Sequence, residues 1–209
     1  MSDILCVTNR ALCKGDFLAK IEEIAKAAPS AIILREKDLP QEEYKALAAR
    51  VMEICERNGI PCILHSFINV AIELNCNKIH LPLHILRGMG SVEKEKFSVL
   101  GASCHSLEDA LEAEKLGCTY ITAGHVFATD CKRGIPPRGV DFLKNVCGSV
   151  SIPVYAIGGI DEENIAEVRS AGAAGACIMS GLMCCDDAKL YIQNFEKAGE
   201  HIETYEIQP

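Results

Sequence analysis

Short apolar runs alternate with longer amphipathic segments along this chain of 209 residues, and this rhythm constrains the fold more strongly than any other feature. The runs begin about 25 residues apart and are short and rich in β-branched residues, as buried strands are. Eight of them are predicted to be strands: Ile4–Thr8, Ala31–Leu34, Cys62–Leu64, Lys78–His80, Ser98–Gly101, Tyr120–Ala123, Val154–Ile157 and Ala176–Met179.

The segments between the runs show the periodicity of amphipathic helices. Ser106 opens one of them with a capping-box pattern, and Gly117 follows its end. The fourth unit is the weakest, because Leu81–Glu95 contains Pro and Gly and leaves room for only a short helix. The predicted helices are Asp16–Ala28, Gln41–Asn58, Ile68–Asn75, Ser106–Leu116, Val140–Cys147, Asp161–Ala171 and Ala188–Glu196.

Eight strands that alternate with helices predict an α/β fold, a compact (β/α)8 TIM barrel. The alternative is an open, doubly wound sheet, which would place a glycine-rich loop after the first strand. In this chain the glycine-rich turns follow the seventh and eighth runs instead, where phosphate-binding barrels hold phosphate. We therefore expect one barrel domain over residues 1–197 and a carboxyl-terminal tail over residues 198–209.

Composition excludes several classes of function. The net charge of −8 gives no electrostatic support for binding nucleic acid or acidic membranes. No apolar run approaches the roughly 20 residues that span a bilayer, and no signal peptide is visible at the amino end. The twelve cysteines show no CxxC pair and no zinc-site spacing, so no metal site is expected. These features predict a cytoplasmic protein with free thiols.

His125 is the strongest candidate for chemistry. It follows Gly124 at the end of the sixth run, and the carboxyl ends of barrel strands carry the active site. Most histidines are structural, but an imidazole at this position is suited to move protons near neutral pH. His65, which closes the third run, is the second choice.

Two glycine-containing turns at neighbouring strand ends predict a phosphate site. Gly158 and Gly159 follow the seventh run, and Ser180 and Gly181 follow the eighth. Glycines let backbone N–H groups approach an anion without interference from a Cβ. A lone Gly-Gly is usually only a turn, but two such turns on adjacent strands favour a phosphate clamp.

Basic residues gather at the same end of the predicted barrel. Arg35 and Lys37 close the second run, and Lys132 lies in the loop after the sixth. Such charges are commonly solvated surface residues. Their convergence on one rim favours the alternative, in which the planar Arg35 guanidinium binds a carboxylate or a phosphate.

The order of these motifs resembles the thiamine phosphate synthase superfamily over nearly the whole chain. Within it, the segment Gly124–Lys132 looks like the TenI branch of thiazole tautomerases. Synthases typically carry Gly-Pro in place of Gly124-His125, and Thr-x-Thr-Lys where this chain has Thr129-Asp130-Cys131-Lys132. The motifs that carry the resemblance are Leu34-Arg35-Glu36-Lys37, Gly101–Ser106, Gly124–Phe127, Thr129–Lys132 and Ala156–Ile160.

Three departures from the synthase pattern argue against synthase activity. Ile33 stands where synthases carry Gln, and His65-Ser66 stands where their third strand ends in Asn-Asp. Ile85 replaces another metal-binding Asp. Magnesium, which would escort a pyrophosphate, prefers oxygen ligands and loses them here.

The resemblance therefore implies an isomerase, a thiazole tautomerase that aromatises a carboxythiazole phosphate without a metal or redox cofactor. His125 would be its proton shuttle, and Gly158, Gly159, Ser180 and Gly181 would hold the substrate phosphate. A homodimer is also expected. Two alternatives stay open: an atypical, magnesium-dependent synthase that joins a pyrimidine pyrophosphate to a thiazole phosphate, and a non-catalytic regulatory protein that binds thiamine phosphates. The other expected substrate contacts are Arg35, Lys37, His65, Ser103, Thr129, Cys131 and Lys132.

Overall fold

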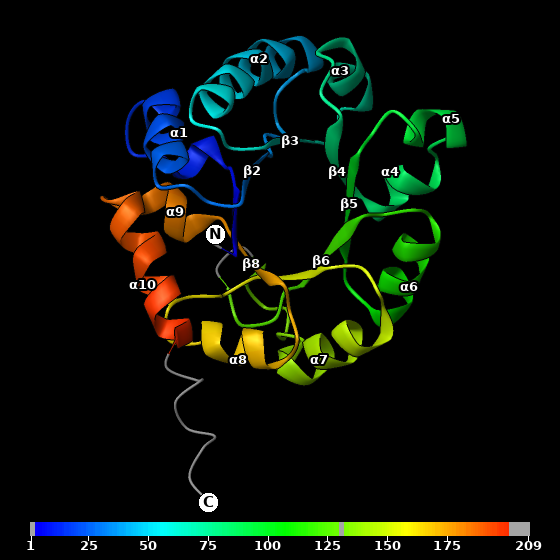
Figure 1. Ribbon diagram of the computed structural model, residues 1–209, viewed down its shortest axis with the longest axis vertical. Coiled ribbons are helices and arrows are strands. Elements are labelled where there is room, and N and C mark those ends of the chain that lie inside the picture. The colour runs from blue at the N-terminus through cyan, green and yellow to red at the C-terminus, as the bar shows by residue number, and fades with distance from the viewer. Residues whose placement is uncertain (1–2, 130–131, 201–209) are drawn as a thin grey trace, which may run out of the picture.

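The computed structural model describes residues 3–129 and 132–200, in which parallel strands close into a barrel ringed by helices (Figure 1). Each strand pairs with the next in sequence, and the last pairs with the first, so the predicted (β/α)8 barrel is confirmed. The strands are β1 (Ile4–Val7), β2 (Ala31–Leu34), β3 (Cys62–His65), β4 (Lys78–Pro82), β5 (Val99–Cys104), β6 (Tyr120–Gly124), β7 (Val154–Ile157) and β8 (Gly175–Ile178).

Some of the helices begin at a side chain that caps them. The side chain of Asp16 accepts a hydrogen bond from the backbone N–H of Ala19 at the start of α1, and Ser106 accepts one from Asp109 at the start of α6. The described helices are η1 (Arg10–Leu12), α1 (Phe17–Lys26), α2 (Gln41–Arg57), α3 (Ile68–Glu73), α4 (Leu83–Arg87), α5 (Ser91–Lys94), α6 (Leu107–Lys115), α7 (Gly139–Ser149), α8 (Ile165–Ser170), α9 (Ser180–Cys184) and α10 (Ala188–Glu200).

Apolar side chains are buried on both faces of the strands. Ile4 and Cys6 pack outward against the helices, and Leu5 and Val7 point into the barrel interior. Successive side chains of a strand point to opposite faces, and helices cover the outer one, so a continuous apolar run is required rather than an alternating one. This is why the short apolar runs located the strands.

The ring of Tyr120 lies in the barrel interior, in space that is free because residue 101 is a glycine. Gly101 on β5 lies opposite Tyr120 on β6, and a Cβ at Gly101 would stand 2.3 Å from the ring carbon Cζ of Tyr120. The ring therefore fits inside the barrel only because residue 101 lacks a side chain. From there its hydroxyl reaches 2.9 Å from Nδ1 of His80 on β4.

Two sequence predictions concern residues at or beyond the edges of the described structure. α10 crosses the expected domain boundary at residue 197, and the rest of the predicted tail lies outside the described residues. Cys131 also lies outside them. Among the described residues, no helix is long and apolar enough to cross a bilayer.

Candidate active site

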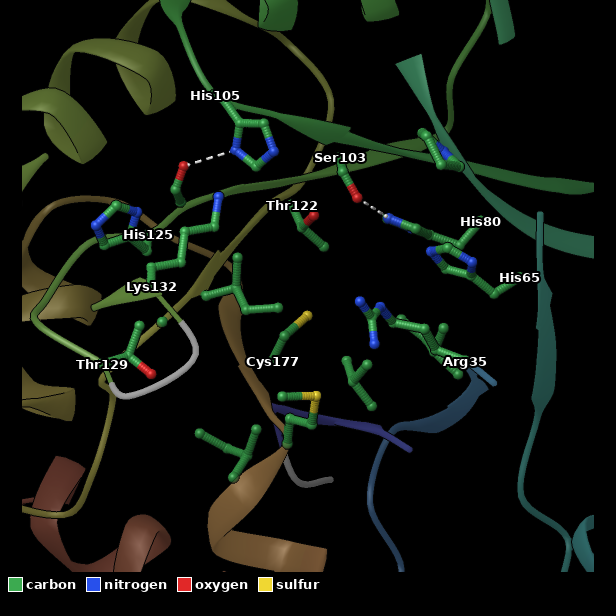
Figure 2. Close-up of a pocket in the computed structure, with 18 of the residues that line it drawn as sticks. Arg35, His65, His80, Ser103, His105, Thr122, His125, Thr129, Lys132 and Cys177 are labelled. Carbon is green, nitrogen blue, oxygen red and sulfur yellow. Dashed lines mark hydrogen bonds between the residues drawn. The ribbon is translucent and has the colours of Figure 1, made fainter. Parts of the chain in front are cut away.

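A cavity of about 620 Å³ opens at the carboxyl ends of the strands. Figure 2 shows side chains from several strands and from the loop after β6 around it. Every predicted site residue that the structure describes lines this cavity, and Cys131 is outside the described residues. These lining residues are Arg35, Lys37, His65, Ser103, His125, Thr129, Lys132, Gly158, Gly159, Ser180 and Gly181.

Glu36, between the two basic residues of β2's end, is buried and acts as an anchor. Its carboxylate accepts a hydrogen bond of 2.6 Å from the hydroxyl of Thr8 and two of 3.1 Å from the backbone N–H of Arg10. Neighbouring side chains of an extended segment point in opposite directions. With Glu36 fixed toward β1, Arg35 and Lys37 are directed into the cavity.

Arg35, Lys37 and Lys132, here called the basic trio, all line the cavity. Figure 2 shows the Arg35 guanidinium directed toward the middle of the cavity, with Lys132 on the far side. Partial burial, followed by the positive charges of Arg35 and Lys132, lowers the pKa of Lys37. Three cations that repel one another in one cavity favour an anionic ligand.

The double glycine after β7 is required by a close approach of the chain. Gly158 and Gly159 have φ values of 100° and 66°, a region that favours glycine. A Cβ on Gly158 would lie 2.4 Å from Cβ of His125, and one on Gly159 would lie 2.3 Å from the carbonyl oxygen of Ala128. The glycines therefore let the segment after β6 pack directly on the turn after β7.

Two neutral histidines lie deep in the cavity. Burial lowers the pKa of His65 to about 2 and that of His80 to about 3, and the positive charge of Lys37 contributes to both shifts. Their rings stack with centroids 5.6 Å apart. His80 also lies 2.8 Å from the hydroxyl of Ser103 through Nε2 (Figure 2), so its ring is fixed between Ser103 and Tyr120.

His125 and His105 flank the end of β6. Nδ1 of His105 lies 2.9 Å from the carbonyl oxygen of Gly124 (Figure 2), so this nitrogen carries the proton. Nε2 of His125 lies 3.3 Å from the carbonyl oxygen of Ile135. Nδ1 of His125 is buried and has no hydrogen-bond partner among the described residues, which leaves it as an unsatisfied acceptor at the site.

Magnesium, implied by the family resemblance, does not fit the side chains of the described residues. Asp109 is the one described carboxylate that lines the cavity, and one of its oxygens accepts a hydrogen bond of 2.9 Å from the backbone N–H of His105. The described residues contain no cluster of three His, Cys, Asp or Glu side chains that could hold a metal. Proteins commonly hold magnesium through one or two carboxylates together with substrate phosphates and waters, and apart from Asp109 the described charged side chains that line this cavity are cations.

A family model described as thiamine monophosphate synthase matches residues 4–182. The chain belongs to the thiamine monophosphate synthase family. A protein named thiamine-phosphate synthase 2 from Streptococcus pneumoniae is 34% identical over 197 residues, or 91% of this chain and 92% of that protein. A thiamine-phosphate synthase from Clostridium acetobutylicum is 33% identical over 187 residues, 88% of each chain. The solved thiamine phosphate pyrophosphorylase from Pyrococcus furiosus has a TM-score of 0.80 at 27% identity and covers 95% of this chain and 96% of its own.

These relatives of the thiamine monophosphate synthase family overturn the predicted function. A thiazole tautomerase, which is an isomerase, was expected from the sequence, and synthase activity was ranked lower. The relatives are named synthases, which are transferases. The prediction was wrong because it gave most weight to a few positions, such as His65-Ser66 and Ile85. Similarity along nine-tenths of the chain outweighs those positions.

Sequence reasoning missed several members of the site. His80 and His105 were not among the expected site residues, yet both line the cavity. Tyr120 was not considered at all. The pairing of Gly101 with Tyr120 is the signal that could have found it, because a glycine inside a strand marks a close approach of another group.

Proposed function

We propose that this protein is a divergent thiamine-phosphate synthase, which joins a pyrimidine pyrophosphate to a thiazole phosphate. One observation carries the proposal: a single cavity is lined both by the basic trio and by two glycine-containing turns. The reaction brings together two anionic substrates, so it needs two groups of anion-binding residues. The segment Gly124–Lys132, with its TenI-like pattern, is one of the places where this synthase diverges.

The two groups suit the two substrates. The turns at Gly158-Gly159 and Ser180-Gly181 offer backbone and hydroxyl groups to the phosphate of the thiazole. The basic trio faces the pyrophosphate of the pyrimidine. This assignment leaves the reacting atoms in the middle of the cavity.

The coupling forms a carbon–nitrogen bond to the thiazole ring and breaks the carbon–oxygen bond to the pyrophosphate. The electron pair of the broken bond leaves with the pyrophosphate oxygen, where negative charge develops. Fixed cations aimed at that oxygen stabilise the transition state more than the ground state. Arg35, Lys37 and Lys132 are positioned for this role, and no proton has to be removed from the ring nitrogen that attacks.

The neutral histidines have a different part. Because the pKa values of His65 and His80 lie far below 7, their rings supply hydrogen bonds rather than charge. Ser103 and Tyr120 hold His80 in place. We assign these groups to the walls that shape and orient the pyrimidine half of the substrate pair.

The test is a coupling assay with both substrates, in which thiamine phosphate and released pyrophosphate are measured together. We expect one pyrophosphate for each thiamine phosphate. Replacing Lys132 with Met removes a charge-assisted contact to the leaving group, so the turnover number is expected to fall at least about tenfold.

The matched control is Lys26→Met, which removes the same charge from an exposed site at the end of α1. This variant should couple at the wild-type rate. If the wild-type protein forms no thiamine phosphate from the two substrates, with or without magnesium, the synthase assignment is wrong. Binding of thiamine phosphate without turnover would instead support the regulatory alternative.

A further inference from the structure

We propose that this barrel binds the diphosphate group of its substrate without a divalent metal, by means of the basic trio alone. The inference rests on the proposed function for the identity of the substrate. It concerns a property that can be measured separately, namely the binding of inorganic pyrophosphate. Three features of the cavity carry it.

The first feature is the supply of unpaired positive charge. Arg35, Lys37 and Lys132 have no ion-pair partner among the described residues. Other arginines, outside the cavity, do have one, as Arg57 with Glu22 and Arg169 with Asp3 show. Three cations without carboxylate partners in one cavity attract an anion that carries several negative charges, as a diphosphate does.

The second feature is the nature of the groups behind the basic trio. His65 and His80 are buried, neutral and stacked, and His65 lies at the end of β3, the strand next to β2, which Arg35 and Lys37 follow. The hydroxyl of Tyr44 fastens the ends of these two strands, because it donates to the carbonyl of Leu34 and accepts from the backbone N–H of His65. Imidazoles at this position offer no oxygen to a hard cation.

The third feature is that the carboxylates described near the trio are already engaged. Glu36 lies between Arg35 and Lys37 in sequence, but it is buried and held by Thr8 and Arg10, and Asp38 pairs with the side chain of Arg10. Asp109 lines the cavity and accepts from the backbone of His105. Within the described residues, the charge facing a diphosphate is therefore positive and comes from protein side chains.

This arrangement predicts whether magnesium strengthens or weakens the binding of pyrophosphate. At a site that needs the metal, magnesium strengthens pyrophosphate binding, since the metal bridges the anion to carboxylates. At a site made of cations, magnesium and the protein compete for the same oxygens. Excess magnesium should then weaken binding, because the neutralised complex has less charge for the basic trio to attract.

Isothermal titration of the full-length protein with inorganic pyrophosphate tests the inference. We expect binding in EDTA, and a dissociation constant that rises when magnesium exceeds pyrophosphate. Lys37→Met should weaken binding in EDTA by about tenfold, the effect of one charge-assisted contact. Lys26→Met, which removes a charge outside the cavity, should not change it. Binding that appears only with magnesium, or no binding in either buffer, overturns the inference.

A substitution at the end of β3 gives a second readout. His65→Asp places a carboxylate beside Arg35 and Lys37, and His65→Asn removes the ring without adding charge. We expect the Asp variant to bind pyrophosphate more weakly in EDTA than the Asn variant does, with magnesium restoring part of the loss. Circular dichroism of both variants verifies that they are folded. Equal binding by the two variants in EDTA contradicts the inference.

The outcomes separate this inference from the proposed function. If pyrophosphate binds in EDTA but no thiamine phosphate forms in the coupling assay, the metal-free site stands and the synthase assignment falls. If thiamine phosphate forms and both coupling and pyrophosphate binding require magnesium, the synthase stands and the metal-free site falls.

Discussion

The hydroxyl of Thr8 donates a hydrogen bond of 2.6 Å to the buried carboxylate of Glu36 and accepts one of 2.9 Å from the backbone N–H of Arg35. The end of β1 is thereby fastened to the end of β2 by a polar group that lies out of water. This contact sets which way the side chains of β2's end face. It links the stability of the barrel mouth to the orientation of the basic trio.

Glu36→Ala is expected to lower both stability and anion binding. Its removal leaves the hydroxyl of Thr8 and the backbone N–H of Arg10 without their acceptor, which costs about 2–3 kcal/mol. Urea unfolding followed by circular dichroism measures this loss, and titration with pyrophosphate measures weaker binding. Asp38→Ala is the control, because this exposed carboxylate pairs with the same Arg10 side chain. An exposed pair contributes little, so equal destabilisation by the two variants would contradict the anchoring role.

Gly159→Ala is expected to disturb the turn after β7. The residue has a φ of 66°, and the added Cβ would lie 2.3 Å from the carbonyl oxygen of Ala128. The unfavourable left-handed conformation of an alanine at position 159 and the clash together should lower the free energy of unfolding by more than about 2 kcal/mol. The apparent KM for the thiazole phosphate should also rise, because the segment after β6 is pushed off the turn.

The control for this glycine is Gly148→Ala. Gly148 lies in α7 and has open space around the position of an added Cβ. There, alanine should stabilise the helix by up to about 1 kcal/mol, since glycine is the more flexible residue in the unfolded chain. Unfolding in urea distinguishes the two glycines, and similar effects at both positions would show that the close approach at Gly159 has no energetic weight.

The fold could be predicted from the sequence because one physical rule governs all eight units. A strand covered on both faces must be apolar throughout, and Ala31–Leu34 and Val154–Ile157 were located to the residue. The ends of β4 and β5 were placed too early, at His80 and Gly101. β4 continues through Leu81 to Pro82, and a proline argues against a strand. β5 continues through Ser103, a polar residue that lines the cavity, so neither end followed from the apolar pattern.

The site was only partly predictable. Positions after the strand ends, such as Arg35 and Lys132, follow from the barrel alone, because all strand ends meet at one mouth. The contacts between strands do not follow from the barrel alone. The hydrogen bond between His80 and Tyr120, for example, depends on the register of β4 against β5 and of β5 against β6. The burial of Glu36 could not be predicted either, because the segment Arg35-Glu36-Lys37 is as highly charged as a solvated surface segment.

His125→Asn tests whether an imidazole transfers a proton in the reaction. Coupling at the thiazole nitrogen removes no proton, so the turnover number for thiamine phosphate formation should fall by less than about tenfold. General acid–base catalysis contributes roughly 10²–10⁴-fold, and a loss of that size would mean that His125 moves a proton in the rate-limiting step. Parallel measurement of pyrophosphate release verifies that any residual rate belongs to coupling.

Acid should destabilise the protein through His65 and His80. Their pKa values of about 2 and about 3 lie below the ordinary value of 6.5, so below pH 6.5 the unfolded chain binds protons that the folded barrel does not. Each histidine then removes up to about 1.4 kcal/mol of unfolding free energy per pH unit, and neither does so above pH 6.5. Urea unfolding between about pH 7 and pH 5 measures the slope. His80→Gln should make it shallower, and an unchanged slope would mean that the folded barrel protonates His80.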